Sequence, residues 1–195
     1  MVLNQTPSLS RLLRNILAQP KVGTAEDIPK EDESQHLVLF ESVLEHVDSP
    51  LKSLNEIYRV LAPGGTAVVN TTNRYKISPT GENGEYRIRF FNWLPDIVKE
   101  SYVFHHLHYN PKLANYTTRP AVHWFSFADL CKLGRMAGFG QFYSFIDLVK
   151  EDDPSIEKSK FRSFIINKLK YNPWLRALSL TQLGSTIIML KRQRL

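Results

Sequence analysis

The residues most able to do chemistry in this sequence follow two apolar runs. Glu45 and His46 stand in the stretch VLEHV, and Asn73 and Arg74 stand in NTTNRY. Histidine is a versatile proton acceptor near neutral pH, so His46 is the candidate catalytic residue, although a histidine there can also cap or pack a helix entry. Asn73 and Arg74 are candidate substrate contacts, because open α/β sheets bind ligands at the carboxyl ends of their strands. The alternative interpretation is that Asn73 and Arg74 are simply polar residues of a turn.

Two predicted strands and a helix position these residues. HLVLFESV (36–43) is apolar at its centre and bounded by polar residues, as expected of a strand buried on both faces. Pro50 suits the first position of a helix whose apolar stripe runs to Leu61. The PGG sequence at 63–65 stops that helix, and the β-branched run TAVVNTT follows as a second strand. Strand, helix, tight turn and strand make a βαβ unit, which implies parallel strands.

Further periodic segments extend this unit to an α/β fold. The predicted elements are a helix over residues 8–18, a helix over 126–138, and strands over 139–149 and 185–192. The first helix carries four apolar residues at helical spacing, Leu9, Leu12, Leu13 and Ile16. The second begins at Ser126, an N-cap with Asp129 three residues later. We predict a mostly parallel sheet with an antiparallel C-terminal strand and helices on both faces.

The length and the local composition predict one domain with two appendages. Residues 1–195 offer room for one full core and are too few for two ordinary domains. Residues 74–125 are rich in aromatics, His and Pro without a sustained period, which predicts a substrate-side insertion or lid. Residues 156–182 predict a basic helical insertion that is broken at Pro173.

The 74–125 segment holds further candidate side chains. Trp124, together with Tyr86 and Trp93, can stack an apolar acceptor, although such aromatics more often pack a lid. The histidines of HHLH (105–108) suggest a metal site, but neither cysteines nor carboxylates accompany them at ligand spacing. Residues of a loop or of a substrate wall are the favoured interpretation, and we expect no metal.

Composition and charge limit the class of protein. With 43% hydrophobic and 23% charged residues, and no run of about 18 apolar residues, the sequence is typical of a soluble chain without a spanning helix. The single cysteine, Cys131, excludes a disulfide framework, and the first residues lack the pattern of a secretory leader. A cytoplasmic location is expected.

The net charge of +6 is carried by the C-terminal segment. From Ile156 onward, nine Lys or Arg residues stand against Glu157 alone. Residues 156–180 mix these charges with aromatic and aliphatic residues, as interfacial amphipathic helices do, so peripheral membrane contact is one interpretation. A helix packed on the sheet edge is the favoured alternative. Nucleic acid is not an expected partner, because the aromatics lie among aliphatics rather than in a stacking array.

The segment from about 25 to 73 resembles the class I S-adenosylmethionine-dependent methyltransferases, especially the type 11 group. Those enzymes commonly run an apolar strand into a vLEHv turn, then a helix ending in RvLkPGG; here these are VLEHV (43–47) and RVLAPGG (59–65). The stretch HWFSFADLCKLGRMAGF is similar to the family's helix before its sixth strand. The resemblance implies a Rossmann-like fold, S-adenosylmethionine as cofactor, and His46 facing the reacting centre.

The sequence departs from the family at the cofactor positions. The family places a glycine loop after its first strand, but the only glycine before Gly64 is Gly23. Asn4 occupies the place of the acid that holds the ribose, and Thr24 that of the adenine-side acid. The resemblance thus implies an incomplete methyltransferase sheet without its first strand and glycine loop. The cofactor contacts that it implies fall on Asn4, Thr24, Ala25 and Glu41.

Two functions follow as expectations. The first is an S-adenosylmethionine-dependent methyltransferase, or part of one, that acts on a small or lipid-like acceptor. The second is a non-catalytic methyltransferase remnant that binds a partner or a membrane surface. A parallel sheet without its first strand leaves an unpaired edge, so self-association is also expected.

Overall fold

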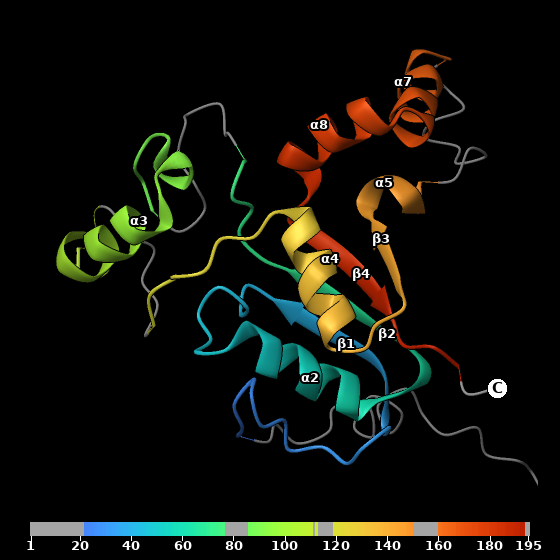
Figure 1. Cartoon of the computed structure of the whole chain (residues 1–195), viewed down its shortest axis with the longest axis horizontal. Coiled ribbons are helices and arrows are strands. Elements are labelled where there is room, and N and C mark those ends of the chain that lie inside the picture. The colour runs from blue at the N-terminus through green and yellow to red at the C-terminus, as the bar shows by residue number, and fades with distance from the viewer. Residues whose placement is uncertain (1–21, 77–85, 111, 113–118, 150–159, 194–195) are drawn as a thin grey trace, which may run out of the picture.

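The computed structural model describes residues 22–76, 86–110, 112, 119–149 and 160–193. The predicted helix over 8–18 and the candidate Asn4 lie outside these residues. The described chain forms one mixed sheet with helices packed against it, a helical excursion beside the sheet, and a C-terminal helical pair (Figure 1).

The sheet has four strands in the order β1-β2-β4-β3. Its strands are β1 (Gln35–Glu41), β2 (Leu61–Asn70), β3 (Gln141–Ser144) and β4 (Thr186–Leu190). β1 and β2 are parallel, while β4 runs antiparallel to both β2 and β3. Three strands therefore share one direction and the C-terminal strand opposes them, which confirms the predicted α/β class.

The helix α2 (Pro50–Val60) forms where the sequence predicts it. The Ser49 side chain accepts a hydrogen bond from the backbone N–H of Lys52, and Pro50 takes the first turn, where no N–H is required. Leu54 and Ile57 are fully buried against the sheet. The PGG segment lies within β2 rather than before it, since β2 starts at Leu61. Its register with β1 is irregular there, and Gly64 takes a φ of +78°.

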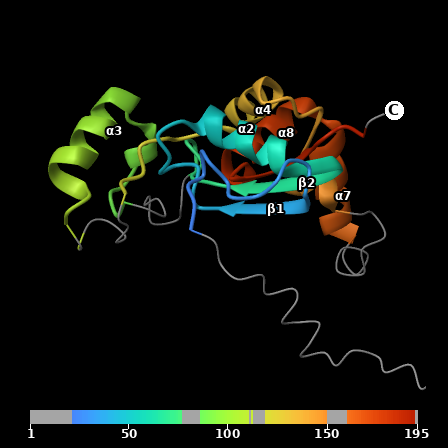
Figure 2. The ribbon, with the colours of Figure 1, turned by 90° about the horizontal axis from the view of Figure 1, so that it is seen from below.

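The helix α4 (Phe127–Met136) completes the helical layer on the same face of the sheet. Its N-terminus is a capping box in which Ser126 and Asp129 bond each other's backbone N–H, as predicted. Figure 2 shows α2 and α4 on one side of β1 and β2. The main core lies in this layer, and its fully buried side chains include Leu44, Leu54, Ile57, Leu61, Ala67, Val69, Leu130, Ile187 and Met189.

The strand predicted over 139–149 is shorter in the structure. β3 ends at Ser144, and α5 (Phe145–Leu148) follows at once. Ser144 and Asp147 form a second capping box, so local hydrogen bonding ends the strand and begins a helical turn.

The excursion between β2 and α4 has a small core of its own. It contains η1 (Phe91–Trp93), α3 (Asp96–Tyr102) and the π-helical turn η2 (Val103–Leu107). Its buried side chains are Tyr86, Phe91, Val103, Leu107, Ala121 and Trp124. Figure 1 shows α3 set to one side of the sheet, and Tyr86 bonds the backbone of Ala121 to close the excursion at its base.

The basic C-terminal segment folds as α7 (Lys160–Tyr171) and α8 (Pro173–Leu183). Asn172 caps α8 by accepting hydrogen bonds from the backbone N–H groups of Trp174 and Leu175. Arg176 of α8 forms an ion pair with Asp147, with its Nη1 2.5 Å from Oδ1. This pair fastens α8 to the end of β3. No helix among the described residues is long and apolar enough to cross a membrane.

Candidate functional site

The carboxyl ends of β1 and β2 lie together because the two strands are parallel. The segment 121–125 runs between the turns that follow them. Its Val122 and His123 donate their backbone N–H groups to the carbonyl of Glu45, at 2.9 and 3.3 Å. On the other side, the Thr72 hydroxyl donates to the carbonyl of His123 at 3.1 Å. One short segment thus braces both strand ends and defines the site.

A buried carboxylate joins the two turns directly. Glu45 is 1% exposed, and its Oε2 accepts a hydrogen bond from the Thr71 hydroxyl at 2.7 Å. The turn itself is tight, because Ser42 has a φ of +51° and donates its N–H to the carbonyl of Asn70. Glu45 therefore fixes the position of the turn after β1 relative to the end of β2.

His46 lies next to a histidine of the excursion. It is half-buried, and its backbone N–H donates to the carbonyl of Val43 at 2.9 Å. Burial lowers the pKa of His108 below its ordinary value, and the nearby His46 lowers it further. The charge of one imidazole therefore acts on another that is 62 positions away in the chain. The sequence placed His108 among the residues of a loop or of a substrate wall, but it gave no sign that His108 would lie near His46.

Asn73 is placed at the site, and both atoms of its side-chain amide form hydrogen bonds within the protein. It is 3% exposed, and its Nδ2 donates to the carbonyl of Leu180 in α8 at 3.2 Å. Its Oδ1 accepts from the backbone N–H of Tyr75, and its own carbonyl accepts from Asn92. Asn73 thus links α8 and the excursion to the end of β2.

Arg74 lines a cavity of about 340 Å³ beside the site. The other lining residues are Tyr75, Asn92, Trp93, Leu94 and Pro95. Arg74 forms an ion pair with Asp96, and this hydrogen bond raises the pKa of the guanidinium. Trp93 is 59% exposed at the cavity, which makes it the more accessible of the aromatics considered from the sequence.

Trp124 lies inside the excursion rather than on a wall. It is 5% exposed and packs edge-on against Phe91, with ring centroids 6.0 Å apart. The ammonium of Lys99 stands 4.2 Å from its ring centroid, and that ammonium also bonds Asp96 at 2.7 Å. Burial lowers the pKa of Lys99, although Asp96 opposes this shift. A buried lysine held by a carboxylate and an aromatic face had no signal in the sequence.

The positions implied for the cofactor do not form a cradle among the described residues. Thr24 and Glu41 are exposed, and Ala25 packs half-buried against the main core. Gly23 is exposed, and a side chain there would clash with Pro29, because a Cβ would lie 2.4 Å from its ring. Within the described part of the chain, these positions therefore do not provide the glycine loop with free backbone N–H donors that S-adenosylmethionine needs.

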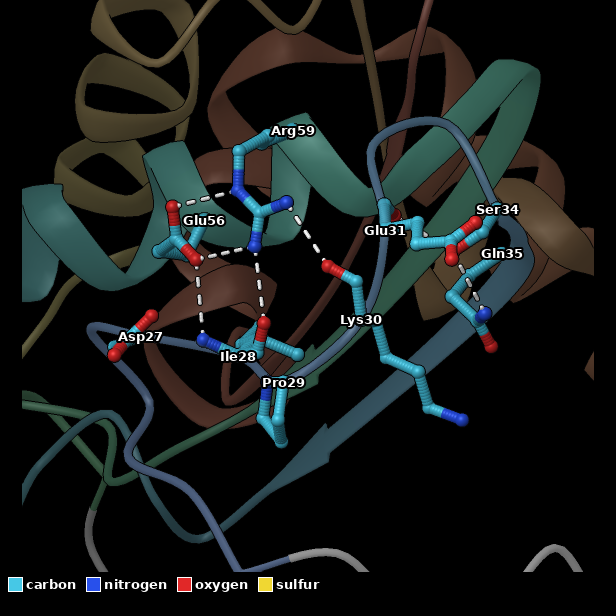
Figure 3. Close-up of a pocket in the computed structure, with 9 residues that line it drawn as sticks. All are labelled: Asp27, Ile28, Pro29, Lys30, Glu31, Ser34, Gln35, Glu56 and Arg59. Atoms are coloured by element: carbon cyan, nitrogen blue, oxygen red, sulfur yellow. Dashed lines mark hydrogen bonds and ion pairs between the residues drawn. The ribbon is translucent and has the colours of Figure 1, made fainter.

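A larger cavity, of about 600 Å³, lies at the other end of β1 (Figure 3). Its most polar lining group is Arg59, whose five N–H donors are all engaged. They bond both carboxylate oxygens of Glu56, the carbonyls of Ile28 and Lys30, and Asp32. Because the guanidinium has no donor left for a ligand, Arg59 serves as a clamp that holds the 28–32 segment onto α2.

No group of three His, Cys, Asp or Glu side chains is placed to hold a metal ion within the part of the chain that the structure describes. His105 instead contacts the carbonyl of Ser101 at 2.6 Å, and Tyr102 packs on His106.

Comparisons with known proteins give the chain its relatives. Residues 3–69 match the family model described as "Methyltransferase domain". A curated protein of Mycolicibacterium smegmatis, described as a probable S-adenosylmethionine-dependent methyltransferase, is 37% identical over 57 residues. Those residues are 29% of this chain and 22% of that protein, so the chain spans about a fifth of the curated relative that it matches.

Solved methyltransferase structures also align with the chain. One is a Thermotoga maritima protein titled a "possible histamine N-methyltransferase", which is 27% identical to this chain. The alignment covers 62% of this chain and 45% of the Thermotoga maritima chain, with a TM-score of 0.40. Another, from Methanosarcina mazei, is 16% identical over 89% of this chain and 67% of its own, with a TM-score of 0.46. Over residues 3–69, this chain is similar in sequence to the methyltransferase domain family, which includes S-adenosylmethionine-dependent methyltransferases.

Proposed function

We propose that this chain supplies the acceptor side of an S-adenosylmethionine-dependent methyltransferase that acts on a small or lipid-like molecule. The observation that carries the proposal is the hydrogen bond between Thr71 and Glu45, which holds the turn that carries His46 beside the start of the 71–75 segment. The contacts of 121–125 with Glu45 and Thr72 hold that arrangement in place.

In this proposal His46 takes a proton from the acceptor. A hydroxyl or amine that gains a methyl group must lose a proton, and a half-buried imidazole is a suitable base. The lowered pKa of His108 keeps that ring neutral near pH 7, so it does not repel a charge that develops on His46. Glu45 positions the turn that carries His46 and does not itself meet the acceptor.

The acceptor wall that we propose is the cavity at Arg74. Its lining combines one guanidinium with the apolar surfaces of Trp93, Leu94 and Pro95, which suits a molecule with an apolar body and a polar or acidic end. Asn73 and Trp124 stand behind this wall and support it. The wall does not distinguish a small acceptor from a lipid-like one.

The positions that would hold the cofactor offer fewer suitable binding groups than the proposed acceptor wall. Thr24, Ala25 and Glu41 remain the positions that the resemblance implies, together with Asn4, which lies outside the described residues. Because the described residues offer no glycine loop and Arg59 is engaged as a clamp, we propose that this chain alone binds S-adenosylmethionine weakly.

Two measurements test the proposal. Calorimetric titration of the full chain with S-adenosylmethionine should give weak binding. Transfer of labelled methyl groups should be measured with a phenol, an amine and phosphatidylethanolamine vesicles as acceptors. Replacing His46 by Gln should reduce transfer by roughly 100-fold, while Thr181→Val, on α8, should leave it unchanged. No heat at millimolar cofactor, with no transfer to any acceptor, would end the enzyme interpretation for this chain.

A second candidate function, a membrane-surface module, rests on the outer face of α7 and α8. Phe164, Tyr171, Trp174 and Leu178 are between 59% and 83% exposed. Lys168 lies beside them, 5.6 Å from the Phe164 ring, so apolar and basic groups share one surface. Arg176 and Lys170 are engaged with Asp147 and with the carbonyl of Val149, so charge contributes less here than aromatic insertion.

Co-sedimentation with vesicles containing anionic lipid tests this second function. Trp174→Ser with Leu178→Ser should abolish binding, and the matched pair Ile97→Ser with Val98→Ser, exposed on α3, should not. Equal binding by both pairs would remove the membrane role. Three further expectations from the sequence remain predictions. They are a cytoplasmic or membrane-peripheral location, the absence of a nucleic-acid partner, and self-association through the outer edge of β1.

A further inference from the structure

The acceptor wall carries a guanidinium on which the protein places one of its own carboxylates. Arg74 follows β2, and its Nη2 donates a hydrogen bond to Oδ2 of Asp96 at the start of α3. A guanidinium has five N–H donors in a planar fork. Among the described residues this bond engages one donor of Arg74, whereas all five donors of Arg59 are engaged. Arg74 therefore keeps donors for a ligand.

Asp96 divides its two oxygens between two cations. Oδ2 accepts from Arg74, and Oδ1 lies 2.7 Å from the ammonium of Lys99. Burial alone would raise the pKa of Asp96, but hydrogen bonds from Arg74 and Lys99 outweigh it and lower the pKa, so the carboxylate is ionised at neutral pH. Asp129 acts on Arg74, and Glu100 on Lys99, through their charge alone. Two bonded cations thus share one carboxylate, and a second anion would balance the cluster.

The bond between Arg74 and Asp96 is placed where it can be exchanged at little cost. The Asp96 side chain is 48% exposed, so water can replace the guanidinium at Oδ2. The Lys99 side chain is fully buried, and its ammonium lies 4.2 Å from the centroid of the Trp124 ring. Lys99 therefore stays in place and holds Asp96 through Oδ1 when Arg74 turns to another anion.

We propose that Arg74 binds the carboxylate or phosphate of a compact aromatic acceptor, and that Asp96 occupies the guanidinium until this acceptor arrives. The inference rests on the acceptor wall of the proposed function and names its substrate class. An arginine fork matches two oxygens of a carboxylate or phosphate, and these charge-assisted pairs are among the strongest polar contacts. Asp96 is thus an internal substitute for the acidic group of the acceptor.

The rest of the wall suits an aromatic ring. Trp93 is 59% exposed and lines the cavity together with Leu94 and Pro95, so a flat apolar surface lies beside the guanidinium. The volume of about 340 Å³ is near the lower end of the range of about 300–1,000 Å³ that is usual for small-molecule sites. The cavity therefore suits one ring with an acidic group better than a long lipid chain.

Calorimetric titration of the full chain without S-adenosylmethionine tests the proposal. Benzoate or phenyl phosphate should bind at least about 10-fold more tightly than benzamide, which has the same ring without the charge. Tighter binding of benzoate would assign a carboxylic acid, and tighter binding of phenyl phosphate a phosphate ester. Arg74→Gln should abolish the preference, and Arg89→Gln, an exposed arginine of the excursion outside the cavity, should keep it. Equal binding of acids and amide, or a preference that survives Arg74→Gln, would overturn the proposal.

Two double variants test the role of Asp96 at constant net charge. Asp96→Ala with Lys99→Met removes the internal carboxylate and the buried cation together, and should tighten binding of the preferred acid by about 5-fold or more, because Arg74 is then always available. Glu100→Gln with Lys99→Met makes the same charge change but leaves Asp96 on Arg74, and should not tighten binding. If both double variants bind the acid alike, Asp96 does not compete for Arg74.

Binding and methyl transfer are measured separately, so the two proposals can fail independently. Selective binding of the acid without transfer to any acceptor would remove the proposed enzyme and leave this inference standing. Transfer to a phenol or an amine without a preference for acids would support the enzyme and overturn this inference. Each variant should keep the circular dichroism spectrum of the parent chain, so that a change in binding reports the contact and not unfolding.

Discussion

The hydroxyl of Thr71 donates a 2.7 Å hydrogen bond to the buried carboxylate of Glu45, and this bond ties the turn after β1 to the end of β2. The same turn carries His46, and the segment after Thr71 carries Asn73 and Arg74. One short polar contact thus sets the spacing between the proposed base and the proposed acceptor wall.

Replacing Thr71 by Val should destabilise the protein by about 1–3 kcal/mol, because Glu45 would stay buried without that donor. The free energy of unfolding in urea at pH 7 measures this. Thr181→Val removes a hydroxyl on the more exposed α8 and should change stability by less than about 0.5 kcal/mol. Equal stability of the two variants would mean that the Glu45 contact contributes nothing.

Replacing Arg59 by Lys should loosen the 28–32 segment while leaving α2 folded. A lysine has three donors on one atom and cannot reproduce the five bonds that the guanidinium makes to Glu56, Asp32 and two carbonyls. Hydrogen exchange should become faster at the backbone N–H of Ile28, which donates to Glu56. Lys52→Arg, on the exposed side of the same helix, is the control, and unchanged exchange at Ile28 in the Arg59 variant would refute the clamp.

The Asp147–Arg176 pair should make the attachment of α8 sensitive to acid. Burial alone would raise the pKa of Asp147, but hydrogen bonds from Arg176 and Ser144 outweigh it and hold the pKa at about 2. Because this lies below the ordinary value of 3.8, the stabilisation is complete above about pH 4 and is lost as the pH falls through about 2. It amounts to about 2 kcal/mol.

Thermal unfolding measured from pH 6 down to pH 2 checks this dependence. Asp147→Asn should be less stable than the parent chain at pH 6, and the two should converge near pH 2. Asp27→Asn is a control, because Asp27 is exposed, and its effect should not depend on pH across this range. A constant difference between Asp147→Asn and the parent chain across this range would contradict the assignment.

Replacing Asp96 by Ala should destabilise the excursion by about 2 kcal/mol, because it leaves the ammonium of Lys99 buried without its carboxylate. Lys99→Met should be close to neutral, since it removes the buried charge and keeps the packing against Trp124. The double variant should recover most of the loss caused by Asp96→Ala. Strictly additive effects in calorimetric unfolding would show that Asp96 and Lys99 do not act as a pair.

Local signals in the sequence were sufficient for the βαβ unit and for both N-caps. Pro50 and the Ser126–Asp129 pair act within a few residues, so their patterns predict α2 and α4 without knowledge of the rest of the fold. The predicted start of β2 and the predicted end of β3 were wrong, and local interactions explain both differences. β2 begins at Leu61 because the glycines are accommodated inside the strand, and β3 ends early because Ser144 and Asp147 form a capping box.

The candidate site was predicted only in outline. The sequence places His46, Asn73 and Arg74 at strand ends, because the ends of neighbouring parallel strands meet at one edge. It gave no sign that Asn73 would donate a hydrogen bond to the carbonyl of Leu180, more than 100 residues away. It also gave no sign that Trp124 would be buried against the ammonium of Lys99. Such contacts depend on how distant segments pack, and no periodicity records them.

By itself, then, the sequence determined the order and kind of the central elements, the relationship of residues 3–69 to methyltransferases, and the lack of a glycine loop before Val43. Only the tertiary structure decided which of the polar residues are free to act. It assigns the donors of Arg59 to a clamp, joins the buried Glu45 to Thr71, and leaves Leu37 and Leu39 exposed. The physical reason is that propensity and capping are local, whereas burial and hydrogen-bond saturation depend on partners that only folding brings together.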